Sequence, residues 1–385
     1  MSPELTGTGP RIMRDLVRRL LDRALVRVLG GGFRPRSVLH VSYMVHVPYY
    51  TVQILRQEGF DAAYMAVDES PLWDRADFRF TPNHRLGFVR LNEWFWFWRI
   101  MARYETVHFH FMITPSELGW EVEELKRLGR NVVVHFRGCE ARDRDRNIAL
   151  HPVLNICQDC DYRPHICKLP RSTLRRDLAA RYADLILVTT PDMRDFLPEA
   201  QHFPFFAPVD AVLPPPSGVL WPERSRFKIV HATTHPGIEG TTAIQAAVDR
   251  LQAKGYPIDF IFLRNVKHSE VLQALADADL AIGKMKMGYY ANAQIESLCC
   301  GVPTITWIRP DLMSAELKES GFIFSNLHDL ADTIEYYFNH PEELAYKRAI
   351  ARQSILRLHD NRAVARQLIA LYDSLSEHRR DGIAR

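Results

Sequence analysis

The sequence lacks any run of the roughly 20 apolar residues that a membrane-spanning helix needs. It also lacks the unbroken apolar core of a secretory signal, because arginine interrupts the apolar residues near the N-terminus every few positions. These two absences predict a cytoplasmic protein. Cysteine is scarce as well, with 6 among 385 residues. In a reducing compartment these cysteines are expected to be packed thiols or metal ligands and not disulfides.

A strong charge of one sign is also missing. The 49 basic and 46 acidic residues leave a formal net charge of +3, which is too small to predict nucleic acid as a partner. Apolar residues make up 47% and charged residues 25%, the balance of a folded globular chain. The length of 385 residues predicts two domains of about 150–200 residues each.

The segment 11–29 has the pattern of an amphipathic helix, with apolar residues at helical spacing and arginines between them. Glycines at 30–32 end it, so residues 1–34 are expected to form a unit of their own. Two interpretations remain open. A basic amphipathic helix can lie on an anionic membrane surface, here the inner face of the membrane. Alternatively, it packs on the domain that follows.

Residues 35–205 alternate between short β-branched strands and helical stretches such as 50–58 and 116–128. Strands separated by helices predict βαβ units and a parallel sheet. The expected strands are 38–43, 62–67, 107–111, 132–136 and 185–190.

Six prolines between 203 and 226 break this pattern, and we interpret 206–226 as an interdomain linker. Alternation resumes in a second domain, 227–345, followed by a helical tail, 346–385. We therefore expect an α/β protein with two Rossmann-like domains facing a cleft, where the carboxyl ends of the strands bind ligands. The strands expected in the second domain are 228–234, 259–263, 280–283 and 304–308, with helices at 241–254, 268–277 and 293–300.

The most specific local pattern lies within 288–307. Asn292 is expected to cap a helix over 293–300. The free N–H groups at the helix start, beside the small Ala291, form a place for a phosphate oxygen. Glu296, one turn in, can accept hydrogen bonds from the two hydroxyls of a ribose; alternatively, it only complements the helix dipole.

Glu296 followed by Gly301 and Pro303 resembles the donor-domain signature of nucleotide-sugar glycosyltransferases of the GT-B fold, in particular the retaining family-four type. The resemblance extends from about 38 to 372, with support from 231–248, 276–283, 108–110 and 135–143. It implies transfer of a sugar from a nucleotide-sugar donor to a glycan acceptor, at the cell surface or linked to lipid. It also implies that no metal is needed at the reacting phosphate.

The resemblance also implies roles for single residues. Glu296 would bind the donor ribose, and Ala291 with Asn292 would hold the diphosphate. His110 would touch the donor sugar from the other domain. The residues that would form the loop facing the cleft are Arg137, Gly138 and Glu140.

Two positions depart from the family pattern. Gly288 stands where the family often has a glutamate, and Glu239 stands where it usually has a lysine at the diphosphate. A carboxylate facing a diphosphate is repulsive, so either nearby cations compensate or the site is altered. Lys284 and Lys286 are the candidates for compensation; otherwise they are surface lysines. A non-catalytic scaffold and a sugar-nucleotide epimerase remain the alternative functions.

Cys157, Cys160 and Cys167 form a CxxC pair with a third cysteine, a set that suits a structural zinc ion. His165 is the fourth ligand that we select; His151 and Cys139 are alternatives, and unpaired thiols are the other interpretation.

The aromatic run 94–98 cannot face inward entirely from one helix, because successive side chains point about 100° apart. Either some of these rings meet a membrane-side acceptor, or the run is buried against the N-terminal segment.

Overall fold

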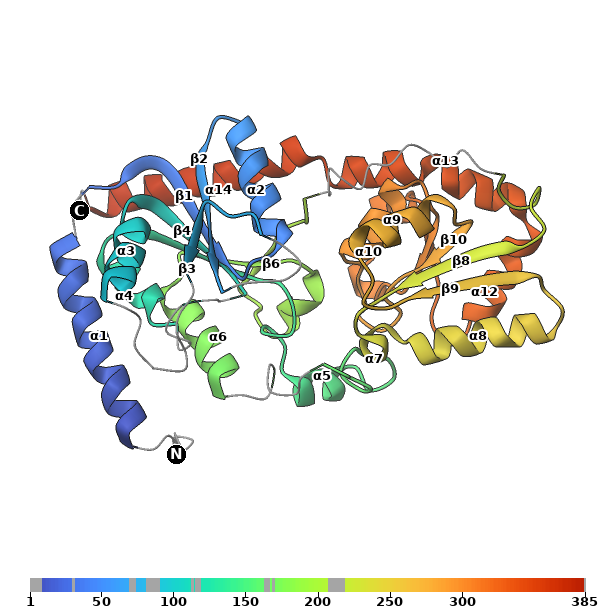
Figure 1. Ribbon diagram of the computed structural model, residues 1–385, viewed down its shortest axis with the longest axis horizontal. Coiled ribbons are helices and arrows are strands. Elements are labelled where there is room, and N and C mark those ends of the chain that lie inside the picture. The colour runs from blue at the N-terminus through green and yellow to red at the C-terminus, as the bar shows by residue number, and fades with distance from the viewer. Residues whose placement is uncertain are drawn as a thin grey trace.

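The computed structural model describes residues 9–29, 32–68, 74–80, 91–111, 114, 119–162, 167, 170–206 and 219–383. The chain forms two lobes, each built around one parallel sheet with helices on both faces (Figure 1). Most of the proline-rich segment, 207–218, lies outside the described residues.

The N-terminal sheet has seven strands in the order β3-β2-β1-β4-β5-β6-β7, and every pairing is parallel. The order reverses direction between β1 and β4, which is the switch point where open parallel sheets bind ligands. The strands are β1 (Arg34–Ser42), β2 (Asp61–Val67), β3 (Phe78–Phe80), β4 (Tyr104–His110), β5 (Asn131–Phe136), β6 (Leu185–Val188) and β7 (Gln201–His202).

The C-terminal sheet has five strands in the order β12-β11-β10-β8-β9, again all parallel. Its switch point lies between β8 and β10. The strands are β8 (Phe227–Ala232), β9 (Ile258–Leu263), β10 (Leu280–Ile282), β11 (Thr304–Thr306) and β12 (Phe322–Phe324).

Helices connect and cover these strands. In the N-terminal lobe they are α1 (Gly9–Leu29), α2 (His46–Gln57), α3 (Leu91–Ala102), α4 (Glu121–Arg127), α5 (Arg144–Leu150) and α6 (Pro170–Tyr182). After β8 they are α7 (Pro236–Glu239), α8 (Thr241–Ala253), α9 (His268–Ala276), α10 (Asn292–Cys299), α11 (Ala315–Lys318), α12 (Leu330–Asn339), α13 (Pro341–Leu358) and α14 (Asn361–Ile383).

The strands form because their residues are apolar and covered on both faces; β4 and β5 are buried at every position. One face of the N-terminal sheet packs on α3 and α4, with Phe109 and Val134 in that core. The opposite face packs on α2 and α14, with Val38 and Leu187 in that core.

Every strand that the sequence predicts is present, with ends shifted by a few residues. Two helices differ more. The helix expected at 50–58 begins earlier, at His46, and the one expected at 116–128 is described as α4, 121–127. The strands were the easier prediction because β-branched apolar runs mark them directly.

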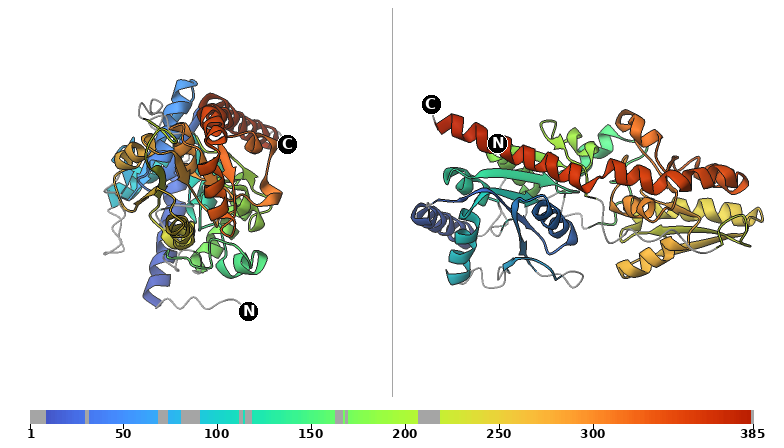
Figure 2. Two further views of the ribbon diagram at one scale, coloured as in Figure 1. Left: turned by 90° about the vertical axis from the view of Figure 1, so that its right-hand side faces the viewer. Right: turned by 90° about the horizontal axis from the view of Figure 1, so that it is seen from above.

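The chain does not end as a free tail. α13 lies along the C-terminal lobe, and α14 crosses back to lie along the N-terminal lobe, as two views show (Figures 1 and 2). Val364, Leu368 and Tyr372 of α14 are part of the N-terminal core. At the bend between the helices, the buried His359 bonds the carbonyl of Phe205 (2.7 Å), so the crossing point is held from both sides.

α1 packs on α3 through a buried carboxylate. Asp22 is 1% exposed and accepts hydrogen bonds from the indole N–H groups of Trp94 and Trp98 (2.6 Å each) and of Trp120 (3.2 Å). Hydrogen bonds to a charged group contribute about 1.5–3 kcal/mol each, and an unmatched buried N–H costs a similar amount. Much of the aromatic run is therefore explained by burial against α1.

Two arginines of α1 point toward α4 and form ion pairs with its glutamates. Arg19 pairs with Glu123, and Arg23 Nε lies 3.0 Å from Glu124 Oε1. Trp96 is the outward-facing ring of the aromatic run, 53% exposed, with the Arg99 guanidinium 5.2 Å from its centre. Among the described residues, none of the helices combines the length and apolar character that crossing a bilayer requires.

Candidate functional site

The carboxyl ends of the two sheets meet at the junction between the lobes. His46, the first residue of α2, follows β1 and is within electrostatic reach of Glu296 and His268 of the C-terminal lobe. It is equally within reach of Arg137, which follows β5. Burial lowers the pKa of His46, and the carboxylate of Glu296 opposes that shift. Side chains from both lobes therefore form one site.

The start of α10 is built differently from the expectation. Ala291, and not Asn292, is the residue that caps the helix, with an extended backbone (φ −143°). Asn292 is wrong as the cap because it already lies in the first helical turn. The side-chain oxygen of Gln294 accepts the N–H of Ala291 (3.2 Å) and replaces the side-chain cap. The next N–H groups, of Asn292 and Ala293, have no partner inside the helix.

Glu296 lies on the buried side of α10, with 8% of the residue exposed. One carboxylate oxygen is 3.2 Å from Nε2 of His268, the first residue of α9. The His268 side chain is 55% exposed. Because His268 is largely exposed, it can move away from Glu296. The carboxylate would then be able to accept hydrogen bonds from the hydroxyl groups of a ligand.

The two lysines after β10 are both engaged by carboxylates. Lys284 pairs with Glu239 of the same lobe. Lys286, whose side chain is only 3% exposed, donates to Asp159 Oδ2 of the N-terminal lobe (2.7 Å). Of the two lysines that were expected to offset Glu239, Lys284 pairs with it, whereas Lys286 pairs with Asp159 and joins the lobes.

A second ion pair joins the lobes beside Lys286. Arg309 Nη1 lies 2.5 Å from Asp195 Oδ2 and 3.0 Å from His151 Nε2, both in the N-terminal lobe. Arg309 also explains Gly288, which has a φ of +82°. A Cβ at Gly288 would lie 2.8 Å from the Arg309 side chain, so a glutamate at this position would be strained and would displace Arg309.

On the N-terminal side, Arg137 and the histidines at the strand ends form a buried network. Arg137 Nε donates to His110 Nδ1 (2.7 Å), and His110 Nε2 lies 2.8 Å from His40 Nδ1. Burial lowers the pKa of His40 to about 3, and the positive charge of Arg137 adds to that shift. Burial, followed by the same charge, holds the pKa of His110 well below its usual range.

Glu140 has a role within its own loop. Its carboxylate accepts the backbone N–H groups of Arg137 and of Gly138, the latter at 3.0 Å. Burial raises the pKa of Glu140, and these backbone hydrogen bonds oppose the shift. The loop 137–140 is therefore held rigid by Glu140, while the guanidinium of Arg137 points to the histidines.

The cysteine-rich segment lies against the C-terminal lobe. Cys157 and Cys160 pack in the same apolar cluster as Ile238 and Met287. A Cβ on Gly237 would lie 2.0 Å from the carbonyl oxygen of Asp159, so a glycine is needed for this close approach.

The described thiols do not form a cluster with metal-ligand spacing. Cys139 and Cys167 each lie within electrostatic reach of Cys157 and Cys160, and His165 lies outside the described residues. Burial raises the pKa of Cys139 to about 11 and raises that of Cys157. In the part of the chain that the structure describes, the one three-residue group with metal-ligating atoms within 4.8 Å of one another is His40, His108 and His110.

Three residues at the junction were not identified from the sequence: His46, His268 and Asp159. None carries a local motif: Asp159 and His46 face the other lobe, and His268 pairs with Glu296 within the C-terminal lobe. The partial signal is position, because His46 and His268 each begin the helix that follows a strand, where parallel sheets place their ligand residues.

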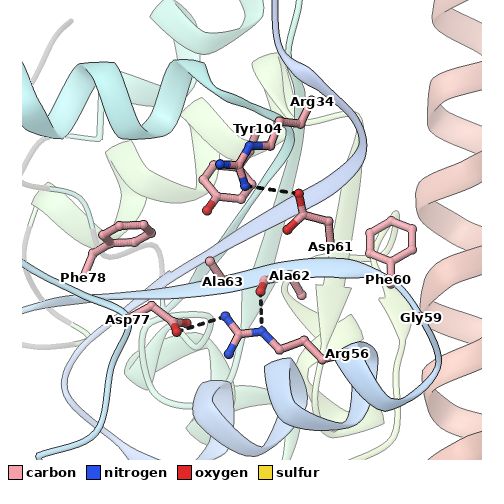
Figure 3. Close-up of a pocket in the computed structure, with 10 residues that line it drawn as sticks. All are labelled: Arg34, Arg56, Gly59, Phe60, Asp61, Ala62, Ala63, Asp77, Phe78 and Tyr104. Atoms are coloured by element: carbon pink, nitrogen blue, oxygen red, sulfur yellow. Dashed lines mark hydrogen bonds and ion pairs between the residues drawn. The ribbon is translucent and has the colours of Figure 1, made fainter.

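A separate depression of about 510 Å³ lies at the opposite, amino-terminal edge of the N-terminal sheet (Figure 3). Arg34 and Asp61, the first residues of β1 and β2, pair there at 3.3 Å. Arg56 pairs with Asp77 at 2.9 Å and donates to the carbonyl of Ala62 at 2.8 Å. Because these charges satisfy one another, the depression is not the candidate site.

The family comparison concerns mainly the C-terminal lobe. A family model described as "Glycosyl transferase-like" matches residues 224–370, from the start of β8 into α14. A search of curated protein sequences gives no significant match.

The solved structures most useful for comparison share the fold at low identity. Sucrose-phosphate synthase from Thermosynechococcus elongatus has a TM-score of 0.57 and 13% identity, over 89% of this chain and 100% of that one. Anabaena HepE in complex with UDP-glucose gives 0.59 and 12%, over 89% and 99%. The catalytic domain of starch synthase IV from Arabidopsis thaliana, bound to ADP and acarbose, gives 0.58 and 10%, over 90% and 99%.

At these identities the similarity shows the fold. The chain has the GT-B architecture of two parallel-sheet lobes, and the glycosyl transferase-like match of residues 224–370 together with this fold supports a glycosyl-transferring enzyme.

Proposed function

We propose that this protein transfers a sugar, with retention of configuration, from a nucleotide-sugar donor to a glycan acceptor that is at the cell surface or linked to lipid. The observation that carries the proposal is the placement of Glu296 on α10, inside the matched stretch and within reach of His46 from the other lobe. HepE was solved with UDP-glucose and starch synthase IV with ADP, which supports a nucleotide-linked donor here.

In the proposed reaction, the bond between the anomeric carbon and the diphosphate oxygen breaks, and a bond to an acceptor hydroxyl oxygen forms. The hydroxyl proton passes to the departing diphosphate oxygen, and the protonated nucleoside diphosphate leaves. Glu296 accepts the ribose hydroxyls, and the unpartnered N–H groups at the start of α10 face the diphosphate. Lys284 and Lys286, on exchanging Glu239 and Asp159 for the phosphates, supply the positive charge that one helix end, worth about half a unit, cannot supply.

Turnover of nucleotide sugars separates this function from its alternatives. Incubation with uridine, adenosine and guanosine diphosphate sugars, with and without glycan acceptors, should release nucleoside diphosphate. A non-catalytic scaffold would bind nucleotide and release nothing. An epimerase would change the sugar without releasing nucleotide, and that result would replace the proposal.

Replacement of Glu296 by alanine should weaken binding of the donor nucleotide by about 2–4 kcal/mol, because two charge-assisted hydrogen bonds to the ribose are lost. Calorimetric titration of the full chain with the nucleoside diphosphate measures this loss. Glu270→Ala is the matched control, since Glu270 is an exposed glutamate of the neighbouring helix α9. A folded Glu296 variant with unchanged nucleotide affinity would contradict the assignment.

Asp159→Asn should strengthen binding of a nucleoside diphosphate several-fold, because Lys286 no longer has to exchange a carboxylate for phosphate. Lys286→Gln should weaken the same binding about tenfold, and binding of the nucleoside alone should change in neither variant. Asp161→Asn is the control, since it removes an equal charge two residues away. If Asp159→Asn and Asp161→Asn have the same effect, the lysine–aspartate exchange is refuted.

A structural zinc ion is a further part of the proposal, with Cys157, Cys160, Cys167 and His165 as ligands and Cys139 as the alternative fourth. The CxxC spacing supports it, as does the approach of Cys139, from a separate segment, to the other thiols. Zinc binds cysteine as the thiolate. Because burial raises the pKa of Cys139 and Cys157, zinc must displace the protons of these thiols when it binds.

Elemental analysis of protein purified without chelator should give about one zinc per chain. Cys160→Ser should lower both the zinc content and the melting temperature, whereas Cys300→Ser, at a buried cysteine of the other lobe, should leave zinc unchanged. Zinc well below one per chain in the unmodified protein would remove the site from the proposal.

Peripheral contact with anionic lipid at the inner membrane face would bring the enzyme to a lipid-linked acceptor. Leu21 and Val28 lie on the outer face of α1, and Val28 is 82% exposed. The exposed Trp96 lies on α3, against which α1 packs. Arg19 and Arg23 pair with glutamates of the protein. Attraction of α1 to the lipid therefore depends on these apolar residues and on the other arginines of the helix.

Changing Leu21 and Val28 together to serine should reduce co-sedimentation with vesicles containing anionic lipid several-fold, with the larger loss at high salt, where the attraction of the remaining arginines is screened. Substitution is preferable to deletion of α1, which would uncover the buried Trp98. Val153→Ser, at an apolar residue that is 80% exposed in the cysteine-rich segment, is the control. Equal sedimentation of the double variant and the unmodified protein would show that α1 is purely structural.

A further inference from the structure

Arg137 is a partly buried cation whose side-chain hydrogen-bond acceptors are imidazoles. Its Nε lies 2.7 Å from His110 Nδ1, and its Nη2 lies 3.4 Å from His135 Nδ1. Within the described residues, it forms no ion pair with a carboxylate. Glu140, the nearest acid, directs its carboxylate to the backbone N–H groups of its own loop.

The guanidinium fixes the protons of the whole network, because it can only donate. His110 must accept at Nδ1, so its own proton is on Nε2 and is donated to His40 Nδ1 (2.8 Å). His40 then carries its proton on Nε2, 3.5 Å from the hydroxyl of Tyr372. The tyrosine in turn donates to His108 Nδ1 (2.6 Å), so the chain of donors runs from Arg137 to α14.

These histidines are neutral, since burial, with the charge of Arg137 as a further cause, holds the pKa of His40, His108 and His110 below the usual range. Neutral imidazoles orient the guanidinium without cancelling its charge. The tautomers set by Arg137 also argue against a metal ion bound by His40, His108 and His110. A ligating His110 would bear its proton on Nδ1, facing the Arg137 donor.

The other cations of the junction differ from Arg137. Lys284 is paired with Glu239, Lys286 with Asp159 and Arg309 with Asp195. Burial lowers the pKa of Arg137 to about 10, which leaves it charged at neutral pH. The carboxylate of Glu140 opposes this shift without pairing with the guanidinium. A cation that has lost water and has no paired anion costs free energy until an anion binds it. Two of the five guanidinium N–H groups bond the imidazoles, and the other three form no hydrogen bond with the residues that the structure describes.

We propose that Arg137 is the binding site for an oxyanion of the substrate, a phosphate or carboxylate group held by the planar fork of its guanidinium. This inference rests on the proposed function, because it assigns the anion to the donor or to the acceptor. His110 and His135 are positioning residues that hold the fork, and Tyr372 extends their network to α14. The site complements α10, which presents N–H groups from the other lobe.

Calorimetric titration of the full chain and of Arg137→Gln tests the site, with inorganic pyrophosphate and matched pairs of nucleoside and nucleoside diphosphate as probes. Glutamine keeps a donor for His110 but removes the charge. Affinity for pyrophosphate and for the diphosphate should fall roughly 10- to 100-fold, while nucleoside affinity should not change. Arg137→Lys, which keeps the charge and loses the fork, should recover part of the loss. Arg362→Gln, on the exposed face of α14, is the control.

Two further arms identify the source of the anion. If diphosphate binding is unaffected but the preference for a nucleotide-linked glucuronate over the corresponding glucose is lost, the anion is the carboxylate of the transferred sugar. If only a sugar 6-phosphate loses affinity, the anion belongs to the acceptor. Circular dichroism melting of each variant separates these outcomes from unfolding.

The inference is overturned if folded Arg137→Gln binds pyrophosphate, the diphosphate, the glucuronate and the sugar phosphate as the unmodified protein does. It is also overturned if charged and neutral ligands weaken equally. Failure of the unmodified protein to bind any nucleoside diphosphate, with pyrophosphate binding still dependent on Arg137, would instead reject the donor part of the proposed function.

Discussion

A partly buried positive charge, oriented by neutral partners, organises the N-terminal half of the site. Arg137 is oriented by imidazoles from β4 and β5, and these connect through His40 of β1 to Tyr372 of α14. Because a guanidinium only donates, one residue sets the tautomer of each ring in turn. The same network explains why the carboxyl ends of three adjacent strands carry histidines at positions that would otherwise be apolar.

The remaining charges at the junction are balanced in pairs, and the pairs join the lobes. Lys286 with Asp159 and Arg309 with Asp195 cross from one lobe to the other, and their side chains are largely buried on the cationic side. Such pairs are a competitor for any anionic ligand, since the phosphate must replace a carboxylate already present. The cysteine-rich segment that supplies Asp159 therefore affects the diphosphate side of the site as well as the packing of the lobes.

The topology places these groups together. Each sheet reverses its strand order once, between β1 and β4 in one lobe and between β8 and β10 in the other. The loops after those strands carry His46, Glu239 and Lys284, which is why residues distant in sequence meet at the junction. α14 then returns to the N-terminal lobe and buries Tyr372 against the histidines, so the C-terminal chain completes a network in the N-terminal core.

The sequence by itself determined the two parallel sheets, the boundaries of their strands within a few residues, and Glu296 on a helix that follows a strand. Those features depend on local patterns of apolar residues, glycine and proline, which act over about ten residues. Only the tertiary structure decided the partners: His268 for Glu296, Asp159 for Lys286, 127 residues apart, and imidazoles for Arg137. A charge finds its partner through tertiary packing, within a lobe for Glu296 and Arg137 and between lobes for Lys286, and no local pattern records which carboxylate or imidazole that packing will bring into contact.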